Sequence, residues 1–202
     1  MTTWLYDLIT NDKPRSGGQA ARVNQILHQP VPLGIVDVHY ENTGARAACV
    51  VAQAWDDVEG CEERVADIAE VMPYRSGAFF ERELPCLVRV LSLVRARPNA
   101  VVVDGYTDLD EHGAPGLGAH LHDQLGRSIP VIGVAKTAYR GGGFAKKLLR
   151  GASRSPLFVT ARGMPIEDAA RLVERMHGGN RIPTLLVRVD QLARGTATPR
   201  GE

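Results

Sequence analysis

Apolar residues recur along this chain at two different spacings, which separate the predicted strands from the predicted helices. Short runs rich in Val, Ile and Ala, bounded by Gly, Pro, Asn or charged residues, are typical of strands. Such runs predict strands at 33–40, 45–55, about 65–71, 100–104, 129–135 and 156–161, and a last extended segment at 184–189. Apolar residues three or four positions apart predict helices at 18–28, 84–97, 115–125 and 165–177.

The order of these segments predicts an α/β fold. The three strands before the helix at 84–97 can pair as an antiparallel meander. The later strands alternate with helices, which is typical of parallel pairing through crossovers. We therefore expect a mixed sheet of three leading antiparallel strands and later parallel strands, with helices on both faces. We expect one domain over 1–202, with a poorly structured N-terminal segment at 1–17 and a C-terminal extension at 185–202.

Three acidic residues interrupt the apolar pattern. Asp37 lies in the middle of the predicted strand "LGIVDVHY", Asp104 ends the strand "AVVVD", and Glu83 precedes the helix that Pro85 opens. A carboxylate on an apolar element is costly unless it is paired or binds a cation. If the first strand lies beside the fourth, Asp37 and Asp104 approach each other, and Glu83 reaches them from the end of its helix.

Carboxylates without an accompanying set of Cys or His ligands suit Mg²⁺ or Mn²⁺. Two such ions about 4 Å apart can activate a water and stabilise the leaving oxygen in phosphodiester hydrolysis. Two of the acids also have an ordinary structural explanation: Asp104 before Gly105 is a turn signal, and Glu83 can cap its helix. Asp37 is the hardest to explain in this way, because an acid inside a strand has few structural uses.

Charge is distributed unevenly although the formal net charge is only +1. Between positions 127 and 164 there are eight Lys or Arg residues and no Asp or Glu, whereas 55–70 is predominantly acidic. A local positive region suits a polyanion, but ordinary solvated faces produce the same pattern.

The cysteines and the absence of apolar targeting segments indicate a cytoplasmic protein. Cys49, Cys61 and Cys86 are an odd number without CxxC spacing, which argues against a disulfide framework or a zinc site and fits a reduced cytoplasm. The N-terminus lacks a basic start followed by an apolar core, and no apolar run approaches the roughly 20 residues that span a bilayer. We therefore expect no membrane partner.

Six segments, in their order and spacing, resemble the endonuclease V family, whose members are inosine-directed nucleases with a ribonuclease H-like fold. They are "GIVDVHY" (34–40), "MPYRSGAFFERELPCL" (72–87), "VVVDGY" (101–106), "GLGAH" (116–120), "IPVIGVAK" (129–136) and "SPLFVTA" (155–161). The resemblance covers roughly 18–180. It implies a metal-dependent endonuclease that cuts the second phosphodiester on the 3′ side of inosine in DNA or RNA, as part of nucleic-acid repair.

The resemblance also implies a set of catalytic residues. The family's metal-binding acids fall on Asp37, Glu83 and Asp104, the acids that interrupt the apolar pattern. The family's basic residue after the fifth strand falls on Lys136, which is expected near a substrate phosphate. The implied cofactor is Mg²⁺, with Mn²⁺ as a substitute, and the implied attacking group is a water activated by the metal.

Five residues are expected at the nucleic-acid interface. Tyr74 and Gly77 fall on the family's wedge, which supports the strand beside the displaced base, and Arg75 adds a charge to it. His120 matches a histidine at the start of a family helix, although a hydrogen-bonded helix histidine is an equally good explanation. Arg140 belongs to a basic, glycine-rich loop.

The chain departs from the family pattern in the wedge and after the fourth strand. The wedge usually reads Pro-Tyr-Ile-Pro-Gly, but here Arg75 and Ser76 take the third and fourth places. After Asp104 the family commonly has a His-Pro-Arg segment. Here Asp110 stands where that histidine is expected, an arginine is missing, and His112 is a candidate substitute.

A further departure lies near the last predicted helix. Arg162 takes the position of a family histidine, which alters a second-metal or phosphate contact. Glu167 or Asp168, in the first turn of that helix, is a candidate fourth acid, although acids there are also ordinary partners of the helix dipole. These departures leave two alternatives: a protein of the same fold that binds nucleic acid without cutting it, and a nuclease for structured junctions.

Overall fold

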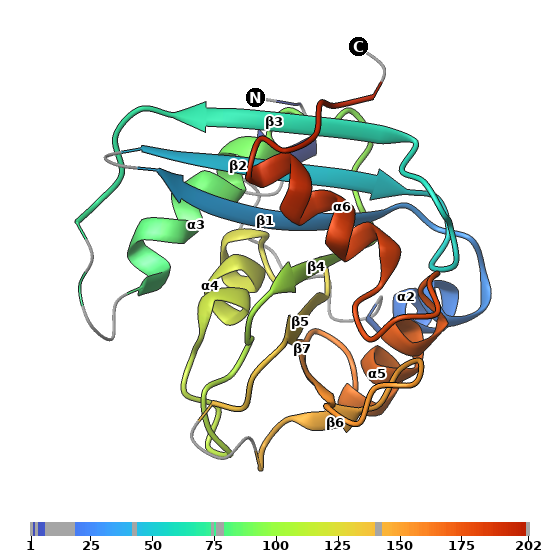
Figure 1. The fold of residues 1–202 in the computed structure, drawn as a ribbon. Coiled ribbons are helices and arrows are strands. Elements are labelled where there is room, and N and C mark those ends of the chain that lie inside the picture. Colours follow the sequence, from blue (N-terminus) through green and yellow to red (C-terminus); the bar gives the residue numbers. More distant parts are fainter. Residues whose placement is uncertain are drawn as a thin grey trace.

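A mixed sheet of seven strands forms the centre of the molecule (Figure 1). The computed structural model describes residues 2, 4–6, 19–41, 44–73, 75, 79–139 and 143–200. The strands are β1 (Leu33–Glu41), β2 (Gly44–Ala52), β3 (Glu62–Ile68), β4 (Ala100–Asp104), β5 (Val131–Ala135), β6 (Lys146–Leu148) and β7 (Leu157–Arg162). Most of 1–17 lies outside the described residues, and the expected single domain over 1–202 stays a prediction.

The strand order is β3-β2-β1-β4-β5-β7-β6. The first three strands pair antiparallel, as the sequence predicts, and β1 pairs in parallel with β4 and β4 with β5. The expected parallel pairing stops there, because β7 runs antiparallel to β5 and to β6. Parallel pairing needs a crossover connection, usually a helix. Between β5 and β7 the described residues form only the short strand β6, which has no counterpart among the predicted strands.

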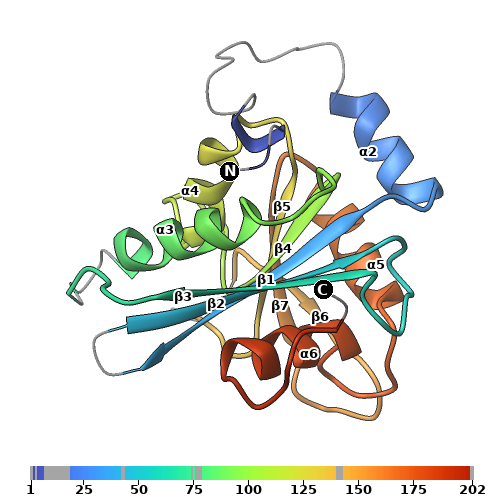
Figure 2. The same ribbon diagram turned by 90° about the horizontal axis from the view of Figure 1, so that it is seen from above.

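Helices cover both faces of the sheet, which confirms the expected α/β fold class (Figure 2). The helices described are α2 (Gln19–His28), α3 (Phe79–Leu91), α4 (Leu117–Gln124), α5 (Ile166–Arg175) and α6 (Thr184–Ala193). α3 and α4 lie on one face, and α5 and α6 lie on the other. Side chains along β1 alternate between the two faces of the sheet. Ile35 packs in the core under α5 and α6, and Val36 packs in the core under α3 and α4. No helix in the described part of the chain is long and apolar enough to cross a membrane.

The helix α3 begins and ends earlier than the sequence predicts, at Phe79 and Leu91 instead of 84 and 97. Pro85 therefore lies inside the helix rather than in its first turn, and Glu83 belongs to the helix rather than preceding it. An interior proline removes one backbone hydrogen bond of the helix. The helix forms despite this loss because its apolar face is buried against the sheet.

The segment 184–189 is helical, not extended as predicted, and forms the first part of α6. Periodicity alone cannot assign a short apolar run to a strand or a helix. The buried residues of the complete element recur at helical spacing: Leu185, Leu186, Val189, Leu192 and Ala193. These residues pack α6 across β1 and β2 (Figure 1).

A buried ion pair fixes α6 on the sheet. Glu63 of β3 is 2% exposed, and its carboxylate accepts hydrogen bonds from Arg188 Nε and Nη2 at 2.8 and 2.7 Å. The backbone N–H of Arg200 donates to the same carboxylate at 2.7 Å. Because both charges are largely removed from water, each depends on the other for compensation. The pair therefore ties the position of α6 to the edge of the sheet.

We expect Glu63→Gln to lower the free energy of unfolding by about 3 kcal/mol, because it leaves Arg188 without its counter-ion. Urea denaturation followed by circular dichroism measures the change. Glu59→Gln is the matched control, since it breaks only the exposed pair of Glu59 with Arg200, and its expected cost is below about 1 kcal/mol. Equal losses in the two variants would contradict the role of Glu63.

Candidate functional site

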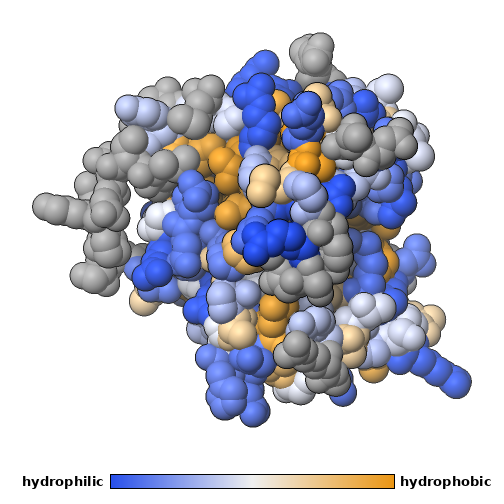
Figure 3. Space-filling model, turned by 90° about the vertical axis from the view of Figure 1, so that its left-hand side faces the viewer, coloured by the Kyte–Doolittle hydropathy of each residue, from blue (hydrophilic) through white to orange (hydrophobic). Residues whose placement is uncertain are grey.

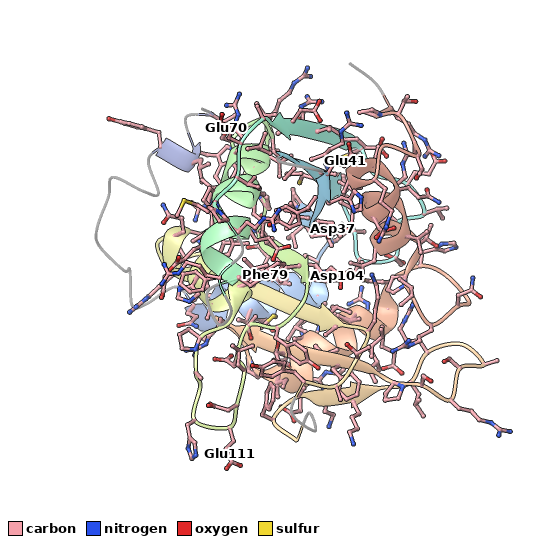
Figure 4. The ribbon with its side chains drawn as sticks, turned by 60° about the vertical axis from the view of Figure 1, so that its left-hand side comes forward. Asp37, Glu41, Glu70, Phe79, Asp104 and Glu111 are labelled. Carbon is pink, nitrogen blue, oxygen red and sulfur yellow. The ribbon has the colours of Figure 1, made fainter. Side chains whose placement is uncertain are left out.

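The parallel pairing of β1 with β4 brings two acidic residues together at the carboxyl ends of these strands. Val36 pairs with Val103. The next residue on each strand is acidic, Asp37 on β1 and Asp104 on β4, and neighbouring strands lie about 4.8 Å apart. Because side chains alternate along a strand, both acids belong to the face that α6 covers. Figure 4 shows Asp37 and Asp104 close together between α3 and α6.

Glu83 of α3 is the third carboxylate of the predicted trio. It is 7% exposed, and it forms no hydrogen bond or ion pair with another residue in the described part of the chain. Burial and the charges of Asp37 and Asp104 raise the pKa of Glu83 to about 8. Burial and Asp104 likewise raise the pKa of Asp37 to about 7. The structure thus brings the three acids together, and their mutual repulsion adds to the cost of burying them.

Lys136 supplies positive charge from the end of β5, and its Nζ forms an ion pair with Asp104 Oδ2. Partial burial works to lower the pKa of Lys136. Asp104, Asp37 and Asp190 outweigh this effect and hold the pKa above its usual value. Lys136 therefore stays charged and neutralises Asp104.

A fourth acid, Asp190 of α6, joins the cluster. Its charge raises the pKa of both Asp37 and Lys136, so its carboxylate lies within electrostatic reach of these two residues, while its Oδ2 accepts a hydrogen bond from Arg194 Nε at 2.9 Å. The sequence analysis does not include it, because the pattern predicts an extended segment at 184–189 and the family resemblance ends near 180. The helical spacing of the buried residues in α6 is the signal that would have indicated it, since it places Asp190 beside the buried face.

The two residues predicted as a fourth acid lie on α5 and have other partners. Glu167 Oε1 is 3.9 Å from Lys146 Nζ, and Asp168 pairs with Arg171 one turn later. Both stand in the first turn of α5, where an acid stabilises the helix dipole. The acid whose charge acts on Asp37 and Lys136 is Asp190 of α6 instead.

The four carboxylates have the donor chemistry of a divalent-cation site. Among the described residues, no three His, Cys, Asp or Glu side chains lie close enough together to hold a metal ion as they stand. Asp104 and Asp190 are paired with Lys136 and Arg194. Asp37 and Glu83 form no ion pair in the described part of the chain, and the charges of the neighbouring acids raise the pKa of both. Hard oxygen donors of this kind suit Mg²⁺ or Mn²⁺. The residues present therefore fit such an ion.

Two of the five residues predicted at the nucleic-acid interface fall within the described residues. Arg75 is exposed, and its Nη1 lies 3.0 Å from Glu81 Oε2. His120 of α4 stacks on Phe80 of α3 with ring centroids 3.6 Å apart, so it joins these two helices. The other three lie outside the described residues: Tyr74, Gly77 and Arg140.

The residues that depart from the family pattern hold the loop after β4. The guanidinium of Arg162 donates to Asp108 Oδ1 through Nε at 2.8 Å and to the carbonyl of Gly113 at 3.0 Å. Asp110 Oδ1 accepts two backbone N–H groups, both at 2.9 Å, as a turn-forming aspartate does. The side chain of His112 is 84% exposed. Arg162 and Asp110 are thus engaged in folding this loop.

The same loop leaves an open space next to Asp104. Gly105 has φ +146°, and among the described residues, its two chain neighbours aside, no atom lies within 4 Å of the position that a Cβ would take. Gly133 of β5 is crowded instead, because a Cβ there would lie 2.6 Å from the carbonyl oxygen of Gly105 and from Thr160 Oγ1. Thr160 Oγ1 also accepts the backbone N–H of Thr107 at 2.8 Å. These contacts hold the loop against β5 and β7.

The fold and the site define an α/β protein with a carboxylate cluster and a lysine at the ends of its central strands. The family model described as Endonuclease V matches residues 20–164. The chain belongs to the endonuclease V family, as its sequence motifs indicate.

Solved structures of this family share the fold. Human ENDOV is 23% identical with a TM-score of 0.68, and the alignment covers 90% of this chain and 95% of that chain. Endonuclease V from Streptomyces avermitilis is 25% identical with a TM-score of 0.67, over 91% of this chain and 92% of that chain. A Ciona intestinalis endonuclease V, solved in complex with a 23mer DNA containing an inosine followed by a ribo-adenosine, is 19% identical with a TM-score of 0.72, over 90% and 94%.

We expect Glu83→Gln to stabilise the metal-free protein at pH 8 by about 1–3 kcal/mol, because it removes a buried charge among acids. With a pKa raised to about 8, folded wild type retains a proton that the unfolded chain releases, so this acid destabilises the wild type increasingly as pH rises from 4.5. Urea denaturation in EDTA at pH 8 and pH 5 measures the gain, which we expect to shrink at pH 5.

Glu81→Gln is the control for this measurement, because Glu81 lies on the same helix but pairs with the exposed Arg75. We expect no gain in stability from it at either pH. A loss of stability in Glu83→Gln at pH 8 would contradict the crowding of carboxylates around this residue.

Proposed function

We propose that this protein is a metal-dependent endonuclease that hydrolyses a phosphodiester on the 3′ side of inosine in DNA or RNA, as part of nucleic-acid repair. The observation that carries the proposal is the cluster of Asp37, Glu83, Asp104 and Asp190 beside Lys136. Membership of the endonuclease V family supports the class of reaction. The likeness to the Ciona protein, which was solved with inosine-containing DNA, supports the substrate.

The four carboxylates are the groups that would hold Mg²⁺, with Mn²⁺ as a substitute. When bound, the metal supplies an activated water for attack on phosphorus and neutralises charge on the leaving oxygen. We assign the central position to Asp37, because it interacts electrostatically with Glu83, Asp104 and Asp190. The other three acids surround it from α3, β4 and α6.

Lys136 is the residue that we assign to a non-bridging oxygen of the substrate phosphate. Its Nζ now neutralises Asp104, and its side chain is 42% exposed. A cation bound by Asp104 would release the ammonium group for the phosphate. Because the surrounding acids hold the pKa of Lys136 above its usual value, the residue acts as a fixed positive charge and not as a proton donor.

The open space beside Gly105 is the position that we assign to the inosine base after it leaves the strand. Gly105 adjoins Asp104, and a Cβ at this position would meet no atom of the described residues within 4 Å beyond its chain neighbours. Phe79, at the start of α3, is 44% exposed and lies 6.2 Å, centroid to centroid, from the ring of Tyr40 on β1. An exposed aromatic ring of this kind gives a base a surface for stacking.

The face of the molecule that carries the carboxyl ends of β1 and β4 is mainly hydrophilic, with small apolar patches between polar side chains (Figure 3). A polar surface interrupted by apolar groups suits a nucleic acid, whose backbone is charged and whose bases are flat and apolar. The roles of Tyr74, Gly77, His120 and Arg140 at this face stay predictions from the resemblance.

We expect the purified protein to cut end-labelled DNA or RNA at the second phosphodiester on the 3′ side of a single inosine, with Mg²⁺ or Mn²⁺ and not in EDTA. Asp104→Asn should lower the rate about a thousandfold or more, because it removes a carboxylate ligand and the partner of Lys136. Denaturing gels of matched oligonucleotides with and without inosine measure both effects.

Glu111→Gln is the control, because the side chain of Glu111 is 81% exposed and extends away from the cluster (Figure 4). We expect the wild-type rate from it. A wild-type rate in Asp104→Asn would contradict the assigned site. Binding without cleavage under both metals would favour a protein that binds nucleic acid without cutting it, and cleavage of junctions alone would favour a structure-specific nuclease.

Asp190→Asn tests whether the fourth acid of the site is Asp190 on α6 or the acid that the sequence predicts on α5. We expect it to lower the single-turnover rate about a hundredfold at a fixed low concentration of Mn²⁺, because the cluster loses one oxygen donor. Asp168→Asn, whose partner is Arg171, should stay within about twofold of wild type. A larger loss in Asp168→Asn than in Asp190→Asn would overturn this assignment.

A further inference from the structure

The carboxyl end of α6 carries one arginine and lies beside the side chain of a second one from the sheet. Arg194 is the C-cap residue of α6, and Arg46 lies on β2. Arg46 Nη1 lies only 2.6 Å from the position that a Cβ of Gly195 would take. Gly195, with φ +68°, therefore allows the guanidinium of Arg46 to lie against the backbone directly after Arg194.

The two arginines use their donors in the same way. Arg46 Nε donates to Asp67 Oδ1 at 2.6 Å, and Arg194 Nε donates to Asp190 Oδ2 at 2.9 Å. Within the described part of the chain, the terminal Nη groups of both residues make no hydrogen bond. A guanidinium carries five N–H donors in a planar fork, so each arginine retains unused donors, and each side chain is at least one-third exposed.

The donors of Arg194 lie within electrostatic reach of the carboxylate cluster, whereas the acids that act on Arg46 are Asp67 and Glu41. Arg46 is the register partner of His39 on β1, two residues beyond Asp37 and on the same face of the sheet. Arg194 follows Asp190 by one helical turn, and the charges of Asp190, Asp37 and Asp104 all act on it. Lys136 stands at the end of β5, on the far side of β4 from β1 and β2. Lys136 and Arg194 therefore both place positive charge within electrostatic reach of the acids.

We propose that the terminal amino groups of Arg194 and Arg46 together bind one backbone phosphate of the substrate strand, next to the phosphodiester that is cleaved. This inference rests on the proposed function, because it requires the nucleic-acid strand to pass over the carboxylate cluster. Planar guanidinium groups match the oxygens of a phosphate, and the terminal Nη groups of both arginines have no hydrogen-bonded acceptor among the described residues. The exposed ion pairs that now hold Nε contribute little, so they leave both side chains free to adjust to the phosphate.

Binding measured without cleavage tests this inference. Fluorescence anisotropy in EDTA reports the affinity for a fluorescein-labelled single-stranded DNA or RNA with one inosine, at several salt concentrations. We expect Arg194→Gln and Arg46→Gln each to weaken binding about threefold to tenfold, and to reduce the slope of log K against log salt by about 0.7. The double variant should lose about 0.7 in total, because the two arginines share one phosphate.

Arg171→Gln is the matched control, since Arg171 is an exposed arginine on α5 that also pairs with an aspartate. We expect its affinity and salt slope to equal those of wild type, and circular dichroism verifies that all variants fold. Unchanged binding in Arg194→Gln and Arg46→Gln, equal losses in Arg171→Gln, or no binding by wild type at low salt would each overturn the inference.

The same set of variants separates this inference from the proposed function. If wild type cuts beside inosine and the two variants bind like wild type, the phosphate site is wrong and the nuclease stands. If wild type does not cut but the variants lose affinity and salt slope, the phosphate site stands and the nuclease assignment fails.

Discussion

The candidate site depends on the parallel pairing of β1 with β4. Their register sets Val36 against Val103 and so places Asp37 beside Asp104 on one face of the sheet. Because side chains alternate along a strand, a slip of one residue would move Asp37 to the opposite face. Both strands are buried in their apolar parts by helices on either side, which specifies the register strongly. The same packing that builds the core thus builds the carboxylate cluster.

The carboxylate cluster lowers the stability of the folded protein. Burial raises the pKa values of Asp37 and Glu83, and each acid adds to the cost of the others. Local rules of stability are broken in this way mainly at functional sites, where the rest of the structure compensates. Part of that compensation comes from α6, which the buried pair of Glu63 with Arg188 ties to β3. The helix in turn carries Asp190 to the acids.

The sequence allows Asp37 to be predicted because a charge inside an apolar strand is conspicuous. Asp104 and Glu83 are predicted beside it from the expected strand pairing and the family resemblance, whereas Asp190 on an amphipathic helix gives no such signal. The short apolar run at its start is compatible with a strand or a helix, and only packing on β1 and β2 decides between them. Contacts also explain the departures at Arg162 and Asp110, which fold the loop after β4. Such contacts join residues distant in sequence, so spacing along the chain does not reveal them.

The most direct test of this account is the location of Mn²⁺ in crystals of the protein, by anomalous scattering. We predict a peak between Asp37 and Asp104, within about 2.2 Å of their carboxylate oxygens, with Glu83 and Asp190 turned towards it. This result would establish the cluster as a cation site independently of any substrate. A Mn²⁺ peak bound by other residues, with the cluster empty and Lys136 still on Asp104, would contradict the account.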